Sequence, residues 1–221
     1  MRVVVYNSRM GSTKKYAEWF AQSTGLKAYS LDEAKTEVSK EDEVIFFSWN
    51  LHAKIQEVDK AEKLFNIIAY AILGMQPSGT MVQDLKDSNF IPEDKPLFTL
   101  IGRYYSEENT GMYKLIMKMV TKTFVKNFNN TPEDERTEVD KMMVHFLTEG
   151  GDHVQESELA EILRWYRVTY PSTATPFDAV SEVAAPESDL KPFVADEAPV
   201  EAPVPEAPSD PTLKPFIAGE E

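Results

Sequence analysis

Cysteine is absent from the 221-residue sequence, which excludes several classes of site at once. Disulfides, thiolate nucleophiles, iron–sulfur clusters and cysteine-ligated zinc all need a side chain that this protein does not have. Histidine is scarce, and the spacing of His52, His145 and His153 indicates no metal site. Redox chemistry by this chain would therefore require a bound cofactor.

Long apolar runs are also missing. No stretch approaches the roughly 20 residues that cross a bilayer. Met1 leads directly into RVVVY at 2–6, without the basic flank, apolar core or cleavage site of a secretory signal, so we expect a cytoplasmic protein. The net charge of −14 argues against nucleic-acid binding, because an acidic protein repels a phosphate backbone.

The C-terminal part of the chain differs in composition from the rest. From Phe177 onward it has eleven acidic residues, two lysines and eight of the fourteen prolines. Such a segment does not bury enough apolar surface to offset the entropy of ordering. We therefore predict a folded domain over 1–170 and a disordered acidic tail, rich in Pro, Ala and Glu, over 171–221.

This tail contains a duplication, LKPFVA at 190–195 and LKPFIA at 213–218. Each copy has the aromatic and aliphatic residues of a short docking peptide, and two copies on one tether would increase avidity for a partner protein. A low-complexity duplication without function is the alternative.

The first hundred residues alternate between short apolar runs and helical patterns. This order predicts an α/β fold with a doubly wound, five-stranded parallel sheet that is buried on both faces. The strands are expected at 2–6, 27–30, 43–48, 67–73 and 96–101.

Helices are expected between these strands and after them. The first should start near Thr13 and stop at Gly25, which suits the C′ position. The pattern predicts two more helices at 56–65 and 80–88. After residue 101 it becomes entirely helical, with helices at 111–125 and 156–167 and, between them, one capped by Thr131 that ends before Gly150. These later helices are expected to cover the sheet.

The loop at 7–13, NSRMGST, follows the first strand and opens the first helix. An open parallel sheet binds ligands at the carboxyl ends of its strands. A phosphate placed there would meet free backbone N–H groups and the positive end of the helix dipole, with Ser8, Ser12 and Thr13 as hydroxyl donors. The alternative is an ordinary strand-to-helix turn capped by Ser12.

Two further loops belong to the same sheet edge. Trp49 follows the third strand beside small polar residues, where it suits either stacking on a planar ring or packing in the core. After the fifth strand, GRYYS at 102–106 presents a glycine, an arginine and two tyrosines, which suit either the polar rim of a ligand or a solvent loop. The convergence of three such loops on one edge favours a binding site.

Three segments of the sequence resemble one known family: VVVYNSRMGSTKKYA at 3–17, EVIFFSWNLHAKI at 43–55 and IGRYYSEENTGMYKLIMKMV at 101–120. The chain resembles the flavodoxin-domain family over residues 1–170, particularly the branch that contains the menaquinone-dependent protoporphyrinogen oxidases. The resemblance implies a flavodoxin-like fold with FMN as cofactor.

The resemblance also assigns residues to the flavin by matching position. The FMN phosphate site comprises Ser8, Arg9, Met10, Gly11, Ser12 and Thr13. One wall of the flavin ring comprises Ser48, Trp49, Asn50 and Leu51, and the other comprises Gly102, Arg103, Tyr104 and Tyr105. We expect no metal, and no catalytic acid or base is identified.

The function expected from these observations is an FMN-dependent redox protein that exchanges electrons with a quinone, a porphyrinogen or a protein partner. One alternative is an electron carrier without catalytic turnover. The other is a flavin-free interaction protein that acts through its tail.

Four lysines recur every fourth residue at Lys114, Lys118, Lys122 and Lys126, so they lie near one another along one helix. In an acidic protein such a stripe suits weak contact with an anionic membrane surface or with an acidic electron-transfer partner. A merely solvated outer face is the alternative.

Overall fold

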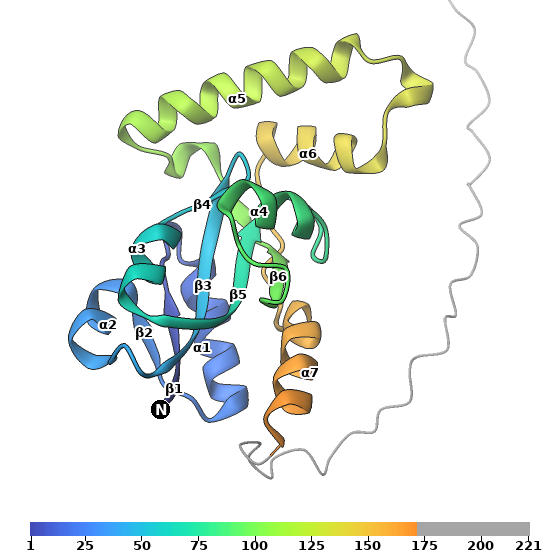
Figure 1. Ribbon diagram of the computed structural model, residues 1–221. Helices are drawn as coiled ribbons and strands as arrows, with labels where there is room; N and C mark the ends of the chain where they lie inside the picture. The colour runs from blue at the N-terminus through green and yellow to red at the C-terminus, as the bar shows by residue number, and fades with distance from the viewer. Residues whose placement is uncertain (172–221) are drawn as a thin grey trace, which may run out of the picture. The chain divides into compact units, whose positions relative to one another are not determined.

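In the computed structural model, which describes residues 1–171, five parallel strands form one sheet in the order β2-β1-β3-β5-β6 (Figure 1). The strands are β1 (Arg2–Tyr6), β2 (Ala28–Ser30), β3 (Glu43–Leu51), β5 (Asn66–Gly74) and β6 (Leu97–Ile101). Short runs rich in β-branched and aromatic residues, largely buried, form β1, β3, β5 and β6, whereas the three residues of β2 are only partly buried. The predicted doubly wound α/β fold is confirmed, and this strand order is the flavodoxin-like one.

The sheet has one addition to the five predicted strands. β3 extends past residue 48 and pairs with the antiparallel strand β4 (Lys54–Ile55). The two residues between them, His52 and Ala53, have φ values of 50° and 58°. Positive φ at both central residues is typical of the tight turns that join hairpin strands.

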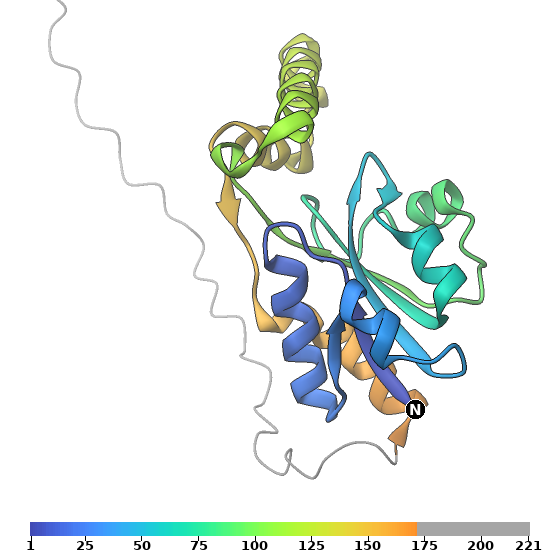
Figure 2. The same ribbon diagram turned by 90° about the vertical axis from the view of Figure 1, so that its left-hand side faces the viewer.

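Helices cover both faces of the sheet (Figure 2). On one face, α1 (Ser12–Thr24) and α7 (Ala160–Thr169) pack Phe20 and Tyr166 against Phe47 of β3. The other face is covered by α2 (Leu31–Glu37), α3 (Val58–Leu64) and α4 (Val82–Asn89). The predicted end of α1 is confirmed, since Gly25 has φ 69° in the C-cap position.

The helices α5 (Gly111–Asn130) and α6 (Glu138–Thr148) form a hairpin beyond the carboxyl ends of the strands (Figure 1). They bury a separate apolar cluster that includes Met117 and Phe146. The expectation that all later helices cover the sheet is therefore wrong for these two. Both have an apolar stripe, and an apolar stripe does not specify which surface it packs against.

Other sequence expectations also need correction. Residues 31–37 form α2, which was not predicted, and α6 is capped by Thr137 rather than Thr131. Thr137 and Asp140 complete a reciprocal capping box, whereas Thr131 ends α5. The region after residue 101 is not entirely helical, because β7 (Arg103–Tyr104) pairs with β8 (Gly151–Asp152).

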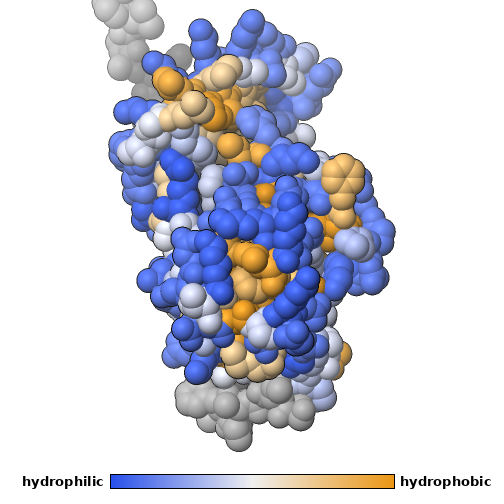
Figure 3. All heavy atoms as spheres, turned by 60° about the vertical axis from the view of Figure 1, so that its left-hand side comes forward, coloured by the Kyte–Doolittle hydropathy of each residue, from blue (hydrophilic) through white to orange (hydrophobic). Residues whose placement is uncertain are grey.

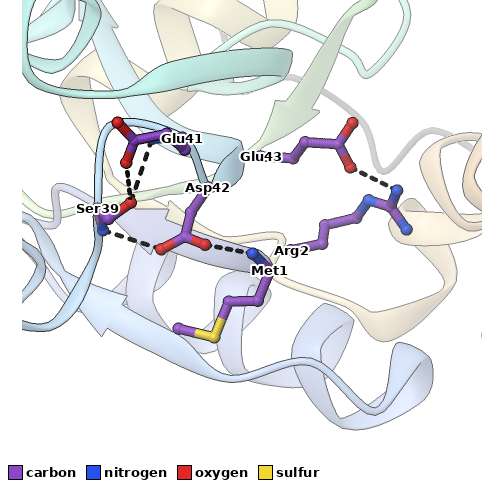
Figure 4. A network of polar contacts seen from close by, with 6 residues as sticks. All are labelled: Met1, Arg2, Ser39, Glu41, Asp42 and Glu43. Carbon is purple, nitrogen blue, oxygen red and sulfur yellow. Dashed lines mark hydrogen bonds and ion pairs between the residues drawn. The ribbon is translucent and has the colours of Figure 1, made fainter.

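A polar network lies at the amino ends of β1 and β3, at the other end of the strands from the α5–α6 hairpin (Figure 4). The amino group of Met1 pairs with Asp42, and Arg2 donates to Glu43 over 2.5 Å. The ion pair with Met1 and the backbone N–H of Ser39 hold the pKa of Asp42 below its ordinary value. These contacts join the starts of β1 and β3, where Arg2 is also the register partner of Glu43.

The predicted tail, with its motifs at 190–195 and 213–218, lies outside the described residues. Within residues 1–171, no helix combines the length and the apolar character needed to cross a membrane.

Candidate functional site

A cavity of about 390 Å³ lies at the carboxyl edge of the sheet. Its walls come from the loops after β1, β3, β5 and β6, and from the inner faces of α5 and α6. This volume falls within the range of about 300–1,000 Å³ that is typical of small-molecule sites. No group of His, Asp or Glu side chains within residues 1–171 has the arrangement of a metal site.

The loop between β1 and α1 leaves polar groups without protein partners. Gly11 is the N-cap of α1 with φ 88°, and no side chain caps the helix. The hydroxyls of Ser8 and Ser12 are buried and make no hydrogen bond. Ser12 therefore does not cap α1, contrary to the alternative expectation. Buried polar atoms are rarely left unpaired in folded proteins, and an anion at this helix N-terminus would satisfy them.

The same loop is fixed to β3 on its far side. The backbone N–H of Asn7 donates to Phe47 over 2.9 Å, and its side-chain amide donates to the Ser48 hydroxyl over 3.3 Å. Ser48 in turn donates to the carbonyl oxygen of Gln56 over 2.7 Å. Ser48 is fully buried in this network, so its hydroxyl positions the loop rather than facing the cavity.

Two aromatic side chains in contact with each other line the cavity. The ring of Trp49 meets the ring of Tyr113 edge-on, with centroids 5.7 Å apart. The Arg9 guanidinium lies over the Tyr113 ring, 3.9 Å from its centroid. Burial raises the pKa of Tyr113, and the positive charge of Arg9 opposes this shift. Tyr113 therefore links α5 to both the first loop and β3.

Asn50 connects the ends of β3 and β5. Its side-chain amide donates to the Leu73 carbonyl over 3.0 Å. A Cβ added at Gly74 would lie 2.8 Å from the Asn50 amide nitrogen, so a larger residue there would displace the Asn50 side chain. The carbonyl of Gly74 accepts from the backbone N–H of Gly102 over 2.8 Å, which continues the connection to the end of β6.

The loop after β6 uses most of its side chains within the protein. Arg103 Nη2 donates to the Glu108 carboxylate over 2.6 Å. The Tyr104 hydroxyl accepts from the Asn109 amide over 3.0 Å, and its ring packs against Phe146. Arg103 Nε and Asn109 Oδ1 are buried without a partner. Tyr105 is half-buried, and it lies outside the cavity wall.

The predicted site residues are thus mostly brought together. Those that line the cavity are Arg9, Met10, Ser12, Thr13, Trp49, Asn50, Leu51, Gly102, Arg103 and Tyr104. Those that do not are Ser8, Gly11, Ser48 and Tyr105. Ser8 and Gly11 still belong to the loop beside it, whereas Ser48 and Tyr105 contact other parts of the protein.

Two parts of the wall were missed from the sequence. The first is the loop after β5, which contributes Met75, Gln76, Pro77, Thr80 and Met81. The sequence contained a signal for this loop, because it also follows a parallel strand at the same edge of the sheet. The second is the α5–α6 hairpin, which contributes Tyr113, Met117, Val120, Phe124, Met143 and Leu147. No local signal places these side chains over the sheet edge.

Comparison with solved structures finds a similarity to a flavodoxin. The chain is similar to a cysteine-to-serine mutant of flavodoxin from Pseudomonas aeruginosa, at 16% sequence identity and a TM-score of 0.27. The match covers 57% of this chain and 97% of the flavodoxin. No family model matches the sequence, and no curated protein matches it.

Proposed function

We propose that the cavity binds FMN and that this chain is a flavin-dependent redox protein. The observation that carries this proposal is the pair of buried, unpartnered hydroxyls, Ser8 and Ser12, at the uncapped start of α1. A phosphate group bound here would accept hydrogen bonds from the Ser12 hydroxyl, which lines the cavity, and from the free N–H groups of the first helical turn, with Ser8 in the same loop. A Cβ added at Gly11 would have no atom within 4 Å, so the space beside this loop is open.

The residues next to the phosphate loop suit a flavin ring. Trp49 and Tyr113 contribute aromatic surface to the cavity wall, and Arg9 adds a positive charge beside them. When bound, FMN accepts and releases electrons singly or in pairs. The chain would orient the ring, and the apolar walls would limit the access of water.

The apolar part of the cavity wall favours an enzyme over a simple carrier. Leu51, Met75, Met81, Met117 and Phe124 line the same cavity as the loop at 7–13. Such walls bind an apolar planar molecule, and methionine side chains adapt to its shape. We propose a quinone or a porphyrinogen as the second substrate. An enzyme turns over such a substrate in a steady-state assay, whereas an electron carrier binds FMN without turnover.

FMN and riboflavin binding together test the phosphate site. Both ligands carry the isoalloxazine ring, and only FMN carries the phosphate. We expect the double variant Ser12→Ala with Thr13→Ala to weaken FMN binding about 100-fold or more, because hydrogen bonds to charged groups contribute roughly 1.5–3 kcal/mol each. Riboflavin binding should change much less. Quenching of flavin fluorescence on titration with protein measures both affinities.

The matched control is Thr36→Ala with Thr148→Ala. These two hydroxyls are exposed and donate to carbonyls of their own helices, far along the chain from the phosphate loop. This control should leave both affinities unchanged. Equal losses for FMN and riboflavin in the Ser12 and Thr13 variant would contradict phosphate binding. Lack of any FMN affinity in the unaltered chain would overturn the proposed function.

A further inference from the structure

The outer face of α5 exposes large apolar side chains. Met112, Leu115 and Met119 have relative exposures of 77%, 68% and 65%. Their spacing of three and four residues places them on one face of the helix. Figure 3 shows one area of apolar surface in the upper part of the molecule, the part that contains α5, and another lower down. A cluster of such side chains on a surface typically marks an interaction site.

Lysines accompany this apolar face. Lys114, Lys118, Lys122 and Lys126 are all exposed, and α5 contains no acidic residue. Within residues 1–171, no carboxylate pairs with any of these four lysines. A helix with four positive charges and no negative one is unexpected in a chain of net charge −14. The local charge therefore differs in sign from that of the whole protein.

The opposite face of α5 already has a role in the fold. Met117 is 1% exposed and packs against the α6 side chains Met143 and Phe146. Tyr113 and Phe124 line the cavity. The outer face is thus a second, separate surface on a helix whose position is fixed by its inner face.

We propose that the outer face of α5 docks on the surface of an anionic lipid bilayer. A helix of this kind lies in the interface, with apolar side chains in the acyl boundary and lysines at the headgroups. Lysine suits this position, because its long aliphatic stem reaches along apolar surface while the ammonium stays in water. Each lysine near an anionic surface adds a favourable electrostatic contribution.

The charge of α5 argues against a second copy of this helix as the occupant. A symmetric pair would place the same patch on both subunits, so the lysines of one helix would face those of the other. No acidic residue of α5 is present to neutralise them. An anionic bilayer supplies negative charge to pair with the lysines and an apolar interior for the exposed apolar side chains. The proposal does not depend on flavin binding.

Vesicle binding by the full chain tests the proposal. We expect the protein to co-sediment with vesicles of phosphatidylglycerol mixed with phosphatidylcholine, and not with vesicles of phosphatidylcholine alone. Binding should weaken as salt is added, because salt screens exposed charges. The triple variant Lys114→Gln, Lys118→Gln and Lys122→Gln should lower the partition coefficient on the order of 100-fold, at roughly fivefold for each lysine.

The matched control neutralises three exposed lysines elsewhere, by Lys27→Gln, Lys40→Gln and Lys63→Gln. It changes the net charge by the same amount and should leave binding nearly unchanged. Equal losses in the two triple variants would show that net charge alone governs binding, and would overturn the proposal.

The apolar contribution is tested separately. Met112→Ser with Met119→Ser should weaken binding to the anionic vesicles about tenfold or more. The control Phe90→Ser removes a side chain that is 90% exposed at the end of α4 and should have little effect. Circular dichroism and thermal unfolding verify that each variant is folded. Failure of the unaltered chain to bind anionic vesicles would overturn the proposal and favour an acidic protein as the partner of α5.

Discussion

The loops after β1 and β6 reach the same cavity, but they differ in how their polar groups are used. In the loop after β1, the buried hydroxyls of Ser8 and Ser12 have no partner in the protein. In the loop after β6, Arg103 bonds to Glu108, and the Tyr104 hydroxyl accepts from Asn109. The Nη2 atom of Arg103 is bonded, whereas its Nε atom is buried without a partner.

This difference separates residues that are available to a ligand from residues that hold the fold. A polar group without a partner weakens the ligand-free protein and gains a partner on binding. A polar group that is already paired must lose a bond before it binds anything else. Substitution of Ser8 or Ser12 is therefore expected to change ligand affinity, whereas substitution of Tyr104, whose hydroxyl is paired, is expected to change the free energy of unfolding.

The largest expected effect is the loss of stability in Tyr104→Ala. Tyr104 is 3% exposed and packs in the apolar cluster between the sheet edge and the α5–α6 hairpin. Removing a buried aromatic ring typically lowers the free energy of unfolding by about 3–5 kcal/mol. Urea unfolding of the variant and of the unaltered chain measures this difference.

Tyr105→Ala is the matched control, because its half-buried side chain lies outside the cavity. We expect it to lower the free energy of unfolding by less than half as much. Equal losses in the two variants would contradict the distinct role of Tyr104.

An intermediate effect is expected for Tyr16→Phe, because this hydroxyl joins α1 to the end of β6. It donates to the Ile101 carbonyl over 2.9 Å and accepts from the Gln155 N–H over 3.2 Å. The variant leaves both backbone groups without this partner and should lose about 1–3 kcal/mol of stability. Its FMN affinity should change little, because the hydroxyl does not face the cavity.

The same hydroxyl predicts a pH dependence. Burial raises the pKa of Tyr16 to about 12, from an ordinary value of 10.0. The folded state therefore favours the neutral phenol, and its contribution to stability is complete below pH 10 and is lost as the pH rises towards 12. The advantage of the unaltered chain over Tyr16→Phe should shrink across this window. Unfolding curves at a series of alkaline pH values measure it, and a constant advantage would contradict the assignment.

The smallest expected effect is a change in the free energy of unfolding that is close to zero or slightly stabilising. Ser8→Ala with Ser12→Ala removes two buried hydroxyls that make no hydrogen bond. Without FMN, the free energy of unfolding should stay within about 1 kcal/mol of the unaltered value or rise slightly, since no protein bond is lost. Thermal unfolding in the absence of flavin measures it. A loss of about 2 kcal/mol or more would show that these hydroxyls are bonded in the ligand-free protein.

Local patterns predicted the strands and the first helix well. The runs at 2–6 and 43–48 form β1 and most of β3, because a strand buried on both faces needs a short, continuous apolar segment. Gly25 ends α1 because its positive φ value favours glycine. The same reasoning missed α2, whose seven residues are too few to show a clear helical period.

The site was predicted only in part. The rule that ligands bind at strand ends identified the loops after β1, β3 and β6, and the loop after β5 was overlooked. Ser48 was expected in the ring wall, but its hydroxyl is used by Asn7 and Gln56. Which way a polar side chain points at a strand end depends on the neighbouring segment, and in this case that neighbour is the β4 hairpin.

The sequence by itself determined the order of the strands along the chain, the polar strand-to-helix loop at 7–13 and the charge of α5, because each depends on residues close together in the sequence. Only the tertiary structure decided that α5 and α6 close the cavity instead of covering the sheet. It also decided that Tyr113 lies between Arg9 and Trp49. These contacts join residues that are far apart in the chain, so packing specifies them and local pattern does not.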